Sequence, residues 1–115
     1  AFANIHLLPP LDYPNLVYLQ KHAKLILTDS GGIQEEAPSF ACPTLVMRYE
    51  TERKEGIEAG VSKLVGADYD KILKESEKIL TSSKAETRLK AQNPYGDGTA
   101  SKQIEGIIRK CLLNA

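Results

Sequence analysis

Short apolar runs alternate along this chain with stretches of helical periodicity, and this alternation limits the possible folds more than any other feature. Short apolar runs suit strands buried in a sheet, and the segments between them repeat their apolar residues at the spacing of a helix face. Strands that are joined through helices pair in parallel. We therefore predict an α/β fold built on a parallel sheet. The predicted strands span residues 5–8, 25–28, 44–47 and 61–65, and the predicted helices span residues 15–22, 33–37 and 68–80, followed by a final helix over residues 104–112.

Two of these helices carry more detailed expectations. In the first, Leu16, Val17 and Leu19 are expected to face inward. In the helix at 68–80 the apolar residues lie near one face, so this helix should cover the sheet, and Asp68 is available as its N-cap.

Composition and charge exclude several classes of protein. The chain, residues 1–115, has the length of a single domain. Its 15 basic and 15 acidic residues form no basic stripe, so nucleic acid is not an expected partner. No apolar run is long enough to span a membrane. Cys42 and Cys111 lie far apart and outside any metal-ligand spacing, so we expect no disulfide, no metal, no cofactor and a reduced, cytoplasmic setting. Because the chain starts at Ala1 without a Met, we expect a piece of a longer protein.

The first candidate site is the turn after the strand at 25–28, because ligands of open parallel sheets lie beyond the carboxyl ends of the strands. Ser30, Gly31 and Gly32 lie in this turn. Two glycines let the backbone approach a ligand closely, the next helix presents unpaired N–H groups, and the serine adds a hydroxyl. This combination suits a diphosphate. The alternative is a tight turn in which Asp29 or Ser30 caps the helix.

Two further features are expected at the same rim of the sheet. Glu35 and Glu36 follow one turn into the helix, and a carboxylate can accept hydrogen bonds from both hydroxyls of a ribose, a role that we assign to Glu36. Arg48 and Arg53 belong to the loop after the strand at 44–47, and guanidinium groups bind phosphate oxygens. The alternatives are an ordinary acidic residue near a helix start and a solvated loop of mixed charge. Together the three features predict a site for a nucleotide diphosphate.

The same segments carry a resemblance to a known family. The strings are DSGGIQEEAP at 29–38, LVMR and TER within 45–53, and NPYGDGTAS at 93–101. In this order and spacing they resemble the non-hydrolysing bacterial and archaeal UDP-N-acetylglucosamine 2-epimerases over essentially the whole chain. The resemblance implies a Rossmann-like three-layer domain, one half of a glycosyltransferase-B type architecture, and an N-terminal domain that this chain lacks.

The resemblance also implies which residues bind the UDP part of the substrate. They are Leu11, Leu16, Ser30, Gly31, Gly32, Glu36 and Arg53. In this assignment the serine-glycine turn holds the diphosphate, the glutamate holds the ribose hydroxyls, and the arginine binds the nucleotide from the facing loop. The two leucines border the uracil, the first through its backbone and the second through its side chain. The chain departs from the family pattern in having Ala-Cys-Pro at 41–43 for Gly-Lys-Pro, and Lys54 for Pro, which loosens the loop that positions Arg53.

Enzymes of this family eliminate UDP to form a 2-acetamidoglucal and re-add it after protonation from the opposite face of C2. The resemblance therefore implies the interconversion of UDP-N-acetylglucosamine and UDP-N-acetylmannosamine, by an intact enzyme that is a homodimer. The acid–base residues of the family lie mostly upstream, so no catalytic residue is assigned here. His6 and His22 are read as a strand residue and a helix-end residue. The isolated chain is expected to bind UDP without turning substrate over.

Two alternatives stay open at this point. One is a 2-epimerase of another UDP-acetamido sugar, such as a UDP-diacetamido uronic acid. The other is a module that presents a surface to a partner, with the final helix docking on it, because fold does not dictate function. In two-domain proteins of the architecture that the resemblance implies, the final helix commonly crosses back onto the N-terminal domain. We therefore expect its apolar face to be exposed in this chain and to drive dimerisation or aggregation.

Overall fold

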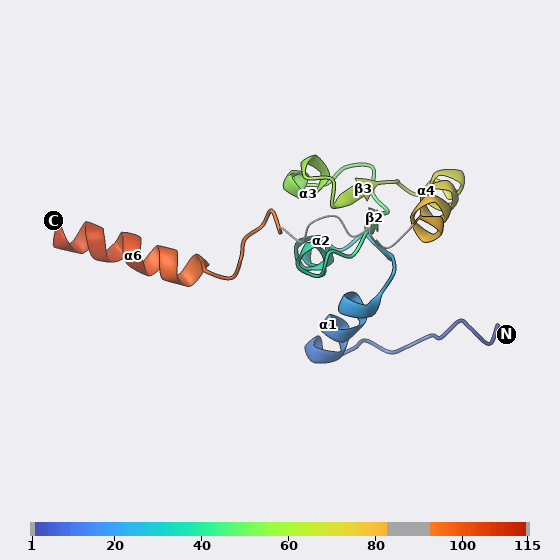
Figure 1. Ribbon diagram of the computed structural model, residues 1–115, viewed down its shortest axis with the longest axis horizontal. Helices are drawn as coiled ribbons and strands as arrows, with labels where there is room; N and C mark the ends of the chain where they lie inside the picture. Colours follow the sequence, from blue (N-terminus) through green and yellow to red (C-terminus); the bar gives the residue numbers. More distant parts are fainter. Residues whose placement is uncertain (1, 83–92, 115) are drawn as a thin grey trace.

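The computed structural model describes residues 2–82 and 93–114, and its elements follow the predicted alternation of strands and helices (Figure 1). The strands are β1 (Ile26–Thr28), β2 (Thr44–Val46) and β3 (Ser62–Leu64). The helices are α1 (Tyr13–His22), α2 (Gly31–Glu36), the 3₁₀ helix η1 (Ala37–Phe40), α3 (Lys54–Glu58), α4 (Tyr69–Thr81) and α6 (Ala100–Leu113). β2 lies between β1 and β3 and pairs in parallel with both. The predicted α/β fold with a parallel sheet is confirmed.

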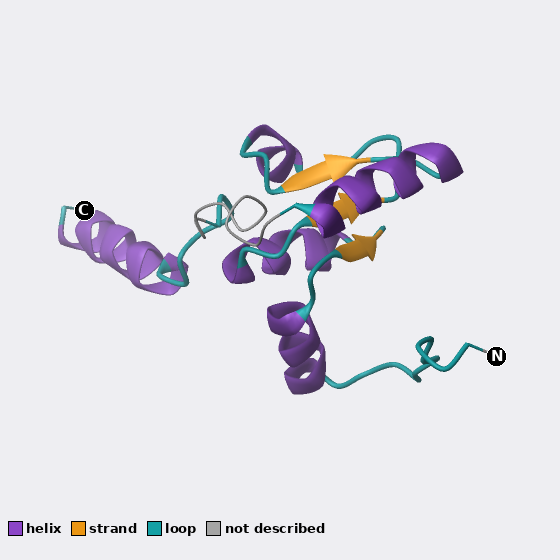
Figure 2. Ribbon diagram, turned by 45° about the vertical axis from the view of Figure 1, so that its right-hand side comes forward, coloured by secondary structure: helices purple, strands orange, loops and turns teal. Residues whose placement is uncertain are grey.

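Helices cover both sides of this sheet. Figure 1 shows α2 and α3 on one side of the strands and α4 on the other, and Figure 2 shows α4 running along the sheet. Helix α4 packs on β2, and the Lys63 ammonium on β3 donates a hydrogen bond of 2.8 Å to the Glu75 carboxylate on α4. This hydrogen bond lowers the pKa of Glu75 below its ordinary value. The prediction that the helix at 68–80 covers the sheet is confirmed.

The core is concentrated around the central strand. All three residues of β2 are buried, as expected of a parallel strand that is covered on both faces. β1 has no described partner on its other edge, and its Leu27 is 44% exposed. The buried apolar residues of the core include Ala37, Cys42, Leu45, Val46 and Val65.

Side-chain caps explain where two of the helices begin. The Asp68 carboxylate accepts a hydrogen bond of 3.0 Å from the Lys71 N–H, which confirms Asp68 as the N-cap of α4. Asp12 accepts in the same way from the Asn15 N–H at 3.1 Å. Because of this cap, α1 begins two residues before the predicted start, with Pro14 in its first turn, where proline is favoured.

Two expectations for the N-terminal part are wrong. Residues 5–8 form no strand, and Leu7 is 95% exposed, because none of the described strands lies beside this segment and an unpaired strand leaves its backbone groups without partners. His6 is therefore not a strand residue. Leu19 does not face inward from α1 but is 45% exposed, whereas Gln20 is buried there. Leu16 and Val17 are half-buried.

The segments between the strands differ from the predictions in detail. α2 begins at Gly31 rather than at residue 33, and Pro38 lies in the first turn of η1. Ala41 ends η1 with φ 51°, in the left-handed region that favours glycine, and this is a position where the resemblance led us to expect glycine. Helix α3 was not predicted, because its N-cap, Arg53, offers no side-chain cap that would signal a helix start.

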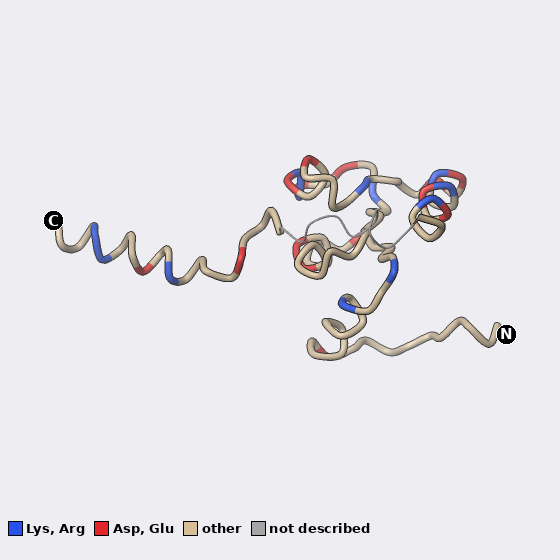
Figure 3. The backbone as a smooth tube through the Cα atoms, viewed as in Figure 1, with Lys and Arg blue, Asp and Glu red and all other residues tan. Residues whose placement is uncertain are grey.

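Helix α6 projects away from the sheet (Figure 1). It has no buried residue, so the expectation of an exposed apolar face is confirmed. Figure 3 shows that acidic and basic residues are mixed along α3, α4 and α6. In residues 2–82 and 93–114, no helix is both long enough and apolar enough to cross a membrane. The large apolar residues exposed on α6 are Ile104, Ile107, Ile108, Leu112 and Leu113.

Candidate functional site

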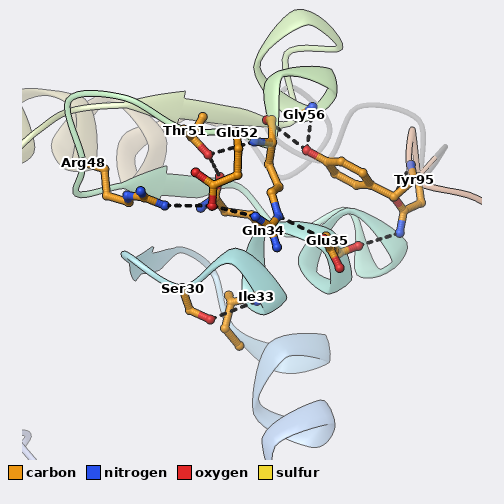
Figure 4. Close-up of polar contacts among 11 residues, drawn as sticks. Ser30, Ile33, Gln34, Glu35, Arg48, Thr51, Glu52, Gly56 and Tyr95 are labelled. Atoms are coloured by element: carbon orange, nitrogen blue, oxygen red, sulfur yellow. Dashed lines mark hydrogen bonds and ion pairs between the residues drawn. The ribbon is translucent and has the colours of Figure 1, made fainter.

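The serine-glycine turn leaves two backbone donors unpaired at the carboxyl end of β1. Ser30 is the N-cap of α2, and its hydroxyl accepts a hydrogen bond of 3.4 Å from the Ile33 N–H (Figure 4). Gly31 and Gly32 therefore occupy the first two helical positions, whose N–H groups have no acceptor inside a helix. No described residue accepts a hydrogen bond from either N–H, and Ser30 and Gly32 are exposed. These two donors can receive an anion from solvent.

The Arg53 side chain lies directly against Gly31. A Cβ atom placed on Gly31 would come within 2.8 Å of the guanidinium carbon and within 2.9 Å of Nη2. Every other amino acid at position 31 carries that atom, so only glycine lets the guanidinium lie over the first turn of α2. The structure thus brings together the serine-glycine turn and the arginine that were predicted to share a site.

Carboxylates surround the guanidinium groups of this corner. Arg53 donates through Nε to Glu35 at 2.9 Å and through Nη1 to Glu52 at 2.6 Å, and Arg48 donates to the same Glu52 oxygen at 3.3 Å (Figure 4). The hydrogen bond to Glu35 raises the pKa of Arg53. The pKa of Glu52 is lowered, first by its own backbone N–H and then by Arg48. Among the described residues, Nη2 of Arg53 has no acceptor, so this edge of the guanidinium remains available to an anion.

The two neighbouring glutamates of α2 face different partners. Glu35 contacts Arg53, whereas Glu36 accepts a hydrogen bond of 2.9 Å from the Gln20 side-chain amide on α1. Gln20 is 3% exposed, and its Oε1 has no hydrogen-bond partner in the part of the chain that the structure describes. Glu36 is half-buried, and this hydrogen bond places its carboxylate toward α1 rather than beside the arginine. Sequence reasoning could not distinguish the directions of these two side chains.

The predicted uracil contacts lie at the start of α1. Leu11 directly precedes the N-cap residue of α1, Leu16 is the fourth residue of the helix, and both are half-buried. Helix α1 packs against η1, and the Gln20 to Glu36 hydrogen bond connects it to α2.

A buried polar link between α2 and the arginine loop was not predicted from the sequence. The Thr51 hydroxyl donates to the Gln34 side-chain carbonyl at 2.8 Å and accepts from the Arg53 N–H at 3.1 Å (Figure 4). Gln34 is 1% exposed and Thr51 is 8% exposed. Both residues lie within segments that carry the family resemblance, but neither is charged, so nothing in the sequence distinguished them from ordinary helix and loop residues.

The segment at 93–95 joins the same two elements from the other side. The Asn93 amide donates to the Glu35 carbonyl at 2.8 Å and to the Ser39 hydroxyl at 2.7 Å. The Tyr95 hydroxyl donates to the Arg53 carbonyl at 3.0 Å and accepts from the Gly56 N–H at 2.9 Å (Figure 4). The sequence analysis gave this segment only as part of a string that carries the family resemblance, with no role in the site. The structure shows that it holds the arginine loop and α2 together.

The remaining candidate groups do not add catalytic chemistry to this corner. His22 ends α1, as predicted, with its Nδ1 2.8 Å from the Tyr18 carbonyl, and His6 is exposed. Within residues 2–82 and 93–114, no group of three or more His, Cys, Asp or Glu side chains could hold a metal ion. The described site therefore consists of hydrogen-bond donors and charged groups suited to binding.

Comparisons with known proteins agree on one family. The family model described as UDP-N-acetylglucosamine 2-epimerase matches residues 1–109. The UDP-N-acetylglucosamine 2-epimerase of Campylobacter jejuni is 51% identical over 109 residues, which are 94% of this chain and 28% of that protein. The crystal structure of UDP-GlcNAc 2-epimerase from Neisseria meningitidis, bound to UDP-GlcNAc, is 42% identical, with a TM-score of 0.82 over 93% of this chain and 30% of that one. The S. aureus MnaA–UDP structure is 41% identical, with a TM-score of 0.85 over 97% of this chain and 30% of that one.

Two statements follow from these comparisons. This chain spans less than a third of the length of the curated relatives that it matches. Its described elements have the arrangement found in one part of these solved relatives, which confirms the predicted fold class, a Rossmann-like domain of a glycosyltransferase-B type architecture.

Proposed function

Because the chain belongs to the UDP-N-acetylglucosamine 2-epimerase family, we propose that it forms the UDP-binding, C-terminal part of such an enzyme. The proposed enzyme interconverts UDP-N-acetylglucosamine and UDP-N-acetylmannosamine and needs a further N-terminal domain. Similar proteins have been solved with UDP-GlcNAc and with UDP bound, which supports a uridine nucleotide as the ligand.

The contact between Arg53 and Gly31 is the observation that carries this proposal. It places a guanidinium edge, two unpaired backbone N–H groups and the Ser30 hydroxyl at the carboxyl ends of neighbouring parallel strands. Donors from two separate loops can thereby bind the two phosphates of one diphosphate, and charge-assisted hydrogen bonds of this kind are stronger than neutral ones. The diphosphate must compete with Glu35 and Glu52 for the arginine.

The nucleoside contacts are proposed on the side of α1. The Glu36 carboxylate binds the ribose hydroxyls while the Gln20 amide holds one of its oxygens. Leu11 through its backbone and Leu16 through its side chain border the uracil, and both lie at the start of α1 and are half-buried. In this arrangement α2 carries the diphosphate on its first turn and the ribose on its last.

The role of this chain in the reaction is to stabilise the leaving group. As a base removes the proton at C2 of the sugar, the C1–O bond breaks and its electron pair leaves with UDP, giving a 2-acetamidoglucal. Return of the proton to the opposite face of C2 and re-formation of the C1–O bond give the epimer. Arg53 and the N–H groups of the first turn of α2 bind the charge that develops on the diphosphate. We assign no proton transfer to a residue of this chain.

The test is calorimetry of the 115-residue chain with UDP, alone and as the double variant Ser30→Ala with Glu36→Ala. We expect measurable binding that the double variant abolishes, because it removes a diphosphate donor and the ribose acceptor together. A matched double variant, Ser101→Ala with Glu58→Ala, changes two exposed residues of other helices and should bind UDP normally.

ADP provides the ligand control. A ligand that binds only the folded state raises apparent stability, so UDP should raise the melting temperature more than ADP does at the same concentration. Unchanged UDP affinity in the Ser30→Ala, Glu36→Ala variant would remove the site assignment. No stabilisation at millimolar UDP would instead favour a module that only presents a surface to a partner.

A further inference from the structure

We propose that Tyr95 is a positioning residue that holds Arg53 in place for the UDP diphosphate, an inference that rests on the function proposed above. No hydrogen bond joins Tyr95 to Gly31 or Ser30 in the described residues. Its hydroxyl instead contacts the backbone of the arginine loop at two points, the Arg53 carbonyl at 3.0 Å and the Gly56 N–H at 2.9 Å (Figure 4).

The contact with the Gly56 N–H completes the start of α3. Arg53 is the N-cap of this helix and supplies no side-chain cap, so the N–H groups of the first turn need acceptors from elsewhere. Gly56 occupies the third helical position, and its N–H is the one that an N-cap side chain often binds. The Tyr95 hydroxyl accepts this hydrogen bond in place of an N-cap side chain. A Cβ atom on the buried Gly56 would come within 2.9 Å of this hydroxyl, so the glycine makes room for the tyrosine.

The contact with the Arg53 carbonyl completes the fixing of the Arg53 backbone on both sides. Its N–H donates to the Thr51 hydroxyl at 3.1 Å, and its carbonyl accepts from Tyr95. Burial raises the pKa of Tyr95, so the phenol keeps its proton and donates to the Arg53 carbonyl at neutral pH. Because the peptide groups on both sides of Arg53 are held, the start of its side chain has a defined position, and the side chain extends from there toward Gly31.

Tyr95 is itself placed by α2, the helix that carries the diphosphate donors. Its N–H donates to the Asn93 side chain at 2.9 Å, and the Asn93 amide binds the Glu35 carbonyl and the Ser39 hydroxyl. The same short segment therefore contacts α2 at one end and the arginine loop at the other. This arrangement sets the position of the guanidinium relative to the N–H groups of Gly31 and Gly32. It also compensates for Lys54, which occupies the first position of α3, where proline would hold the loop more firmly.

The test is a double-mutant cycle on UDP affinity with Tyr95→Phe and Arg53→Ala. Tyr95→Phe removes the hydroxyl and keeps the ring, and we expect it to weaken UDP binding by about fivefold, roughly the contribution of one hydrogen bond. If Tyr95 acts through Arg53, adding Tyr95→Phe to Arg53→Ala should change the affinity no further. Tyr69→Phe, which changes an exposed tyrosine of α4, is the matched control and should bind UDP like the unmodified chain.

Each outcome has a separate meaning. An equal loss from Tyr95→Phe with and without Arg53 would show that Tyr95 only stabilises the fold, and it would overturn this proposal. No loss from Arg53→Ala alone would overturn the proposed diphosphate site instead. If Tyr95→Phe does not fold, hydrogen exchange of the Gly56 N–H in the unmodified chain provides the test. Coupling between two sites is reciprocal, so UDP bound at Arg53 should slow exchange of the N–H that Tyr95 holds. Exchange at Gly56 that saturating UDP leaves unchanged would reject the positioning role.

Discussion

At the scale of single residues, the candidate site depends on the absence of a Cβ atom at Gly31. The Arg53 guanidinium occupies the space that a Cβ atom on Gly31 would need. Gly32 differs, because a Cβ atom there would meet nothing closer than the Ser30 hydroxyl at 3.8 Å. The two glycines of the turn therefore have different roles, the first admitting the arginine and the second leaving the backbone open to solvent.

We predict that Gly31→Ala weakens UDP binding by about tenfold or more, because it displaces a charge-assisted hydrogen-bond donor worth at least about 1.5 kcal/mol. The displaced group is the end of a flexible side chain, so the melting temperature should change little. Calorimetry with UDP and thermal unfolding measure the two effects on the same samples.

Gly106→Ala is the control for this substitution, since it also replaces a helical glycine but meets nothing within 4 Å. It should raise the free energy of unfolding by up to about 1 kcal/mol, the ordinary difference between alanine and glycine in a helix, and leave UDP affinity unchanged. If Gly31→Ala bound UDP as tightly as Gly106→Ala does, the contact between Arg53 and Gly31 would have no part in binding.

At the scale of elements, short strands are held by the helices that cover them. Each strand has three residues, and only β2 has described partners on both edges. Helix α4 adds the Lys63 to Glu75 hydrogen bond to β3 and packs on β2. The stability of the sheet therefore depends on α4, whose own start is set by the Asp68 cap.

We predict that Asp68→Ala lowers the free energy of unfolding by about 1 kcal/mol, the usual contribution of an N-cap side chain. Asp68→Asn is the matched variant, because asparagine caps helices about as well as aspartate, and it should unfold like the unmodified chain. Urea unfolding followed by circular dichroism measures both. Equal losses in the two variants would mean that the charge of Asp68, rather than its cap, stabilises α4.

At the scale of the whole molecule, the chain is less compact than its length would allow. Its radius of gyration is 17.4 Å, against about 13 Å for a compact domain of this size, and it extends over 64 × 29 × 28 Å. Figure 1 shows two reasons, namely the N-terminal segment and α6, which leave the sheet in different directions. Both expose large apolar side chains to solvent, among them Leu7 and Leu112.

We predict that the isolated chain self-associates through the apolar face of α6. Ile104→Lys with Ile108→Lys should shift sedimentation toward the monomer, because it places two charges within that face. Gln103→Lys with Gly106→Lys adds the same charges outside the face and should leave association unchanged. All samples need a reductant, since Cys111 is exposed and could form a disulfide between copies. A clean monomer of the unmodified chain at high concentration would contradict the prediction.

The sequence determined those features that depend on local pattern and on neighbouring residues. The alternation of apolar runs with helical segments predicted β1, β2 and β3, each near its observed position, because this alternation is a pattern of neighbouring residues. Asp68 was recognised as a cap for the same reason, since a cap and its helix are adjacent in the chain. The serine-glycine turn and Arg53 were assigned to one site, and the contact between Gly31 and Arg53 brings these segments together.

Only the tertiary structure decided features that depend on residues far apart in the chain. Residues 5–8 have the composition of a strand but no described strand beside them, and a strand is stable only with a partner. Glu35 and Glu36 are alike in sequence, yet one contacts Arg53 and the other Gln20, because adjacent positions of a helix point about 100° apart. Tyr95 lies 42 residues beyond Arg53, and no periodicity or motif spacing could show that its hydroxyl binds that backbone. Such contacts exist only after the chain has folded, because folding alone brings these groups within hydrogen-bonding distance.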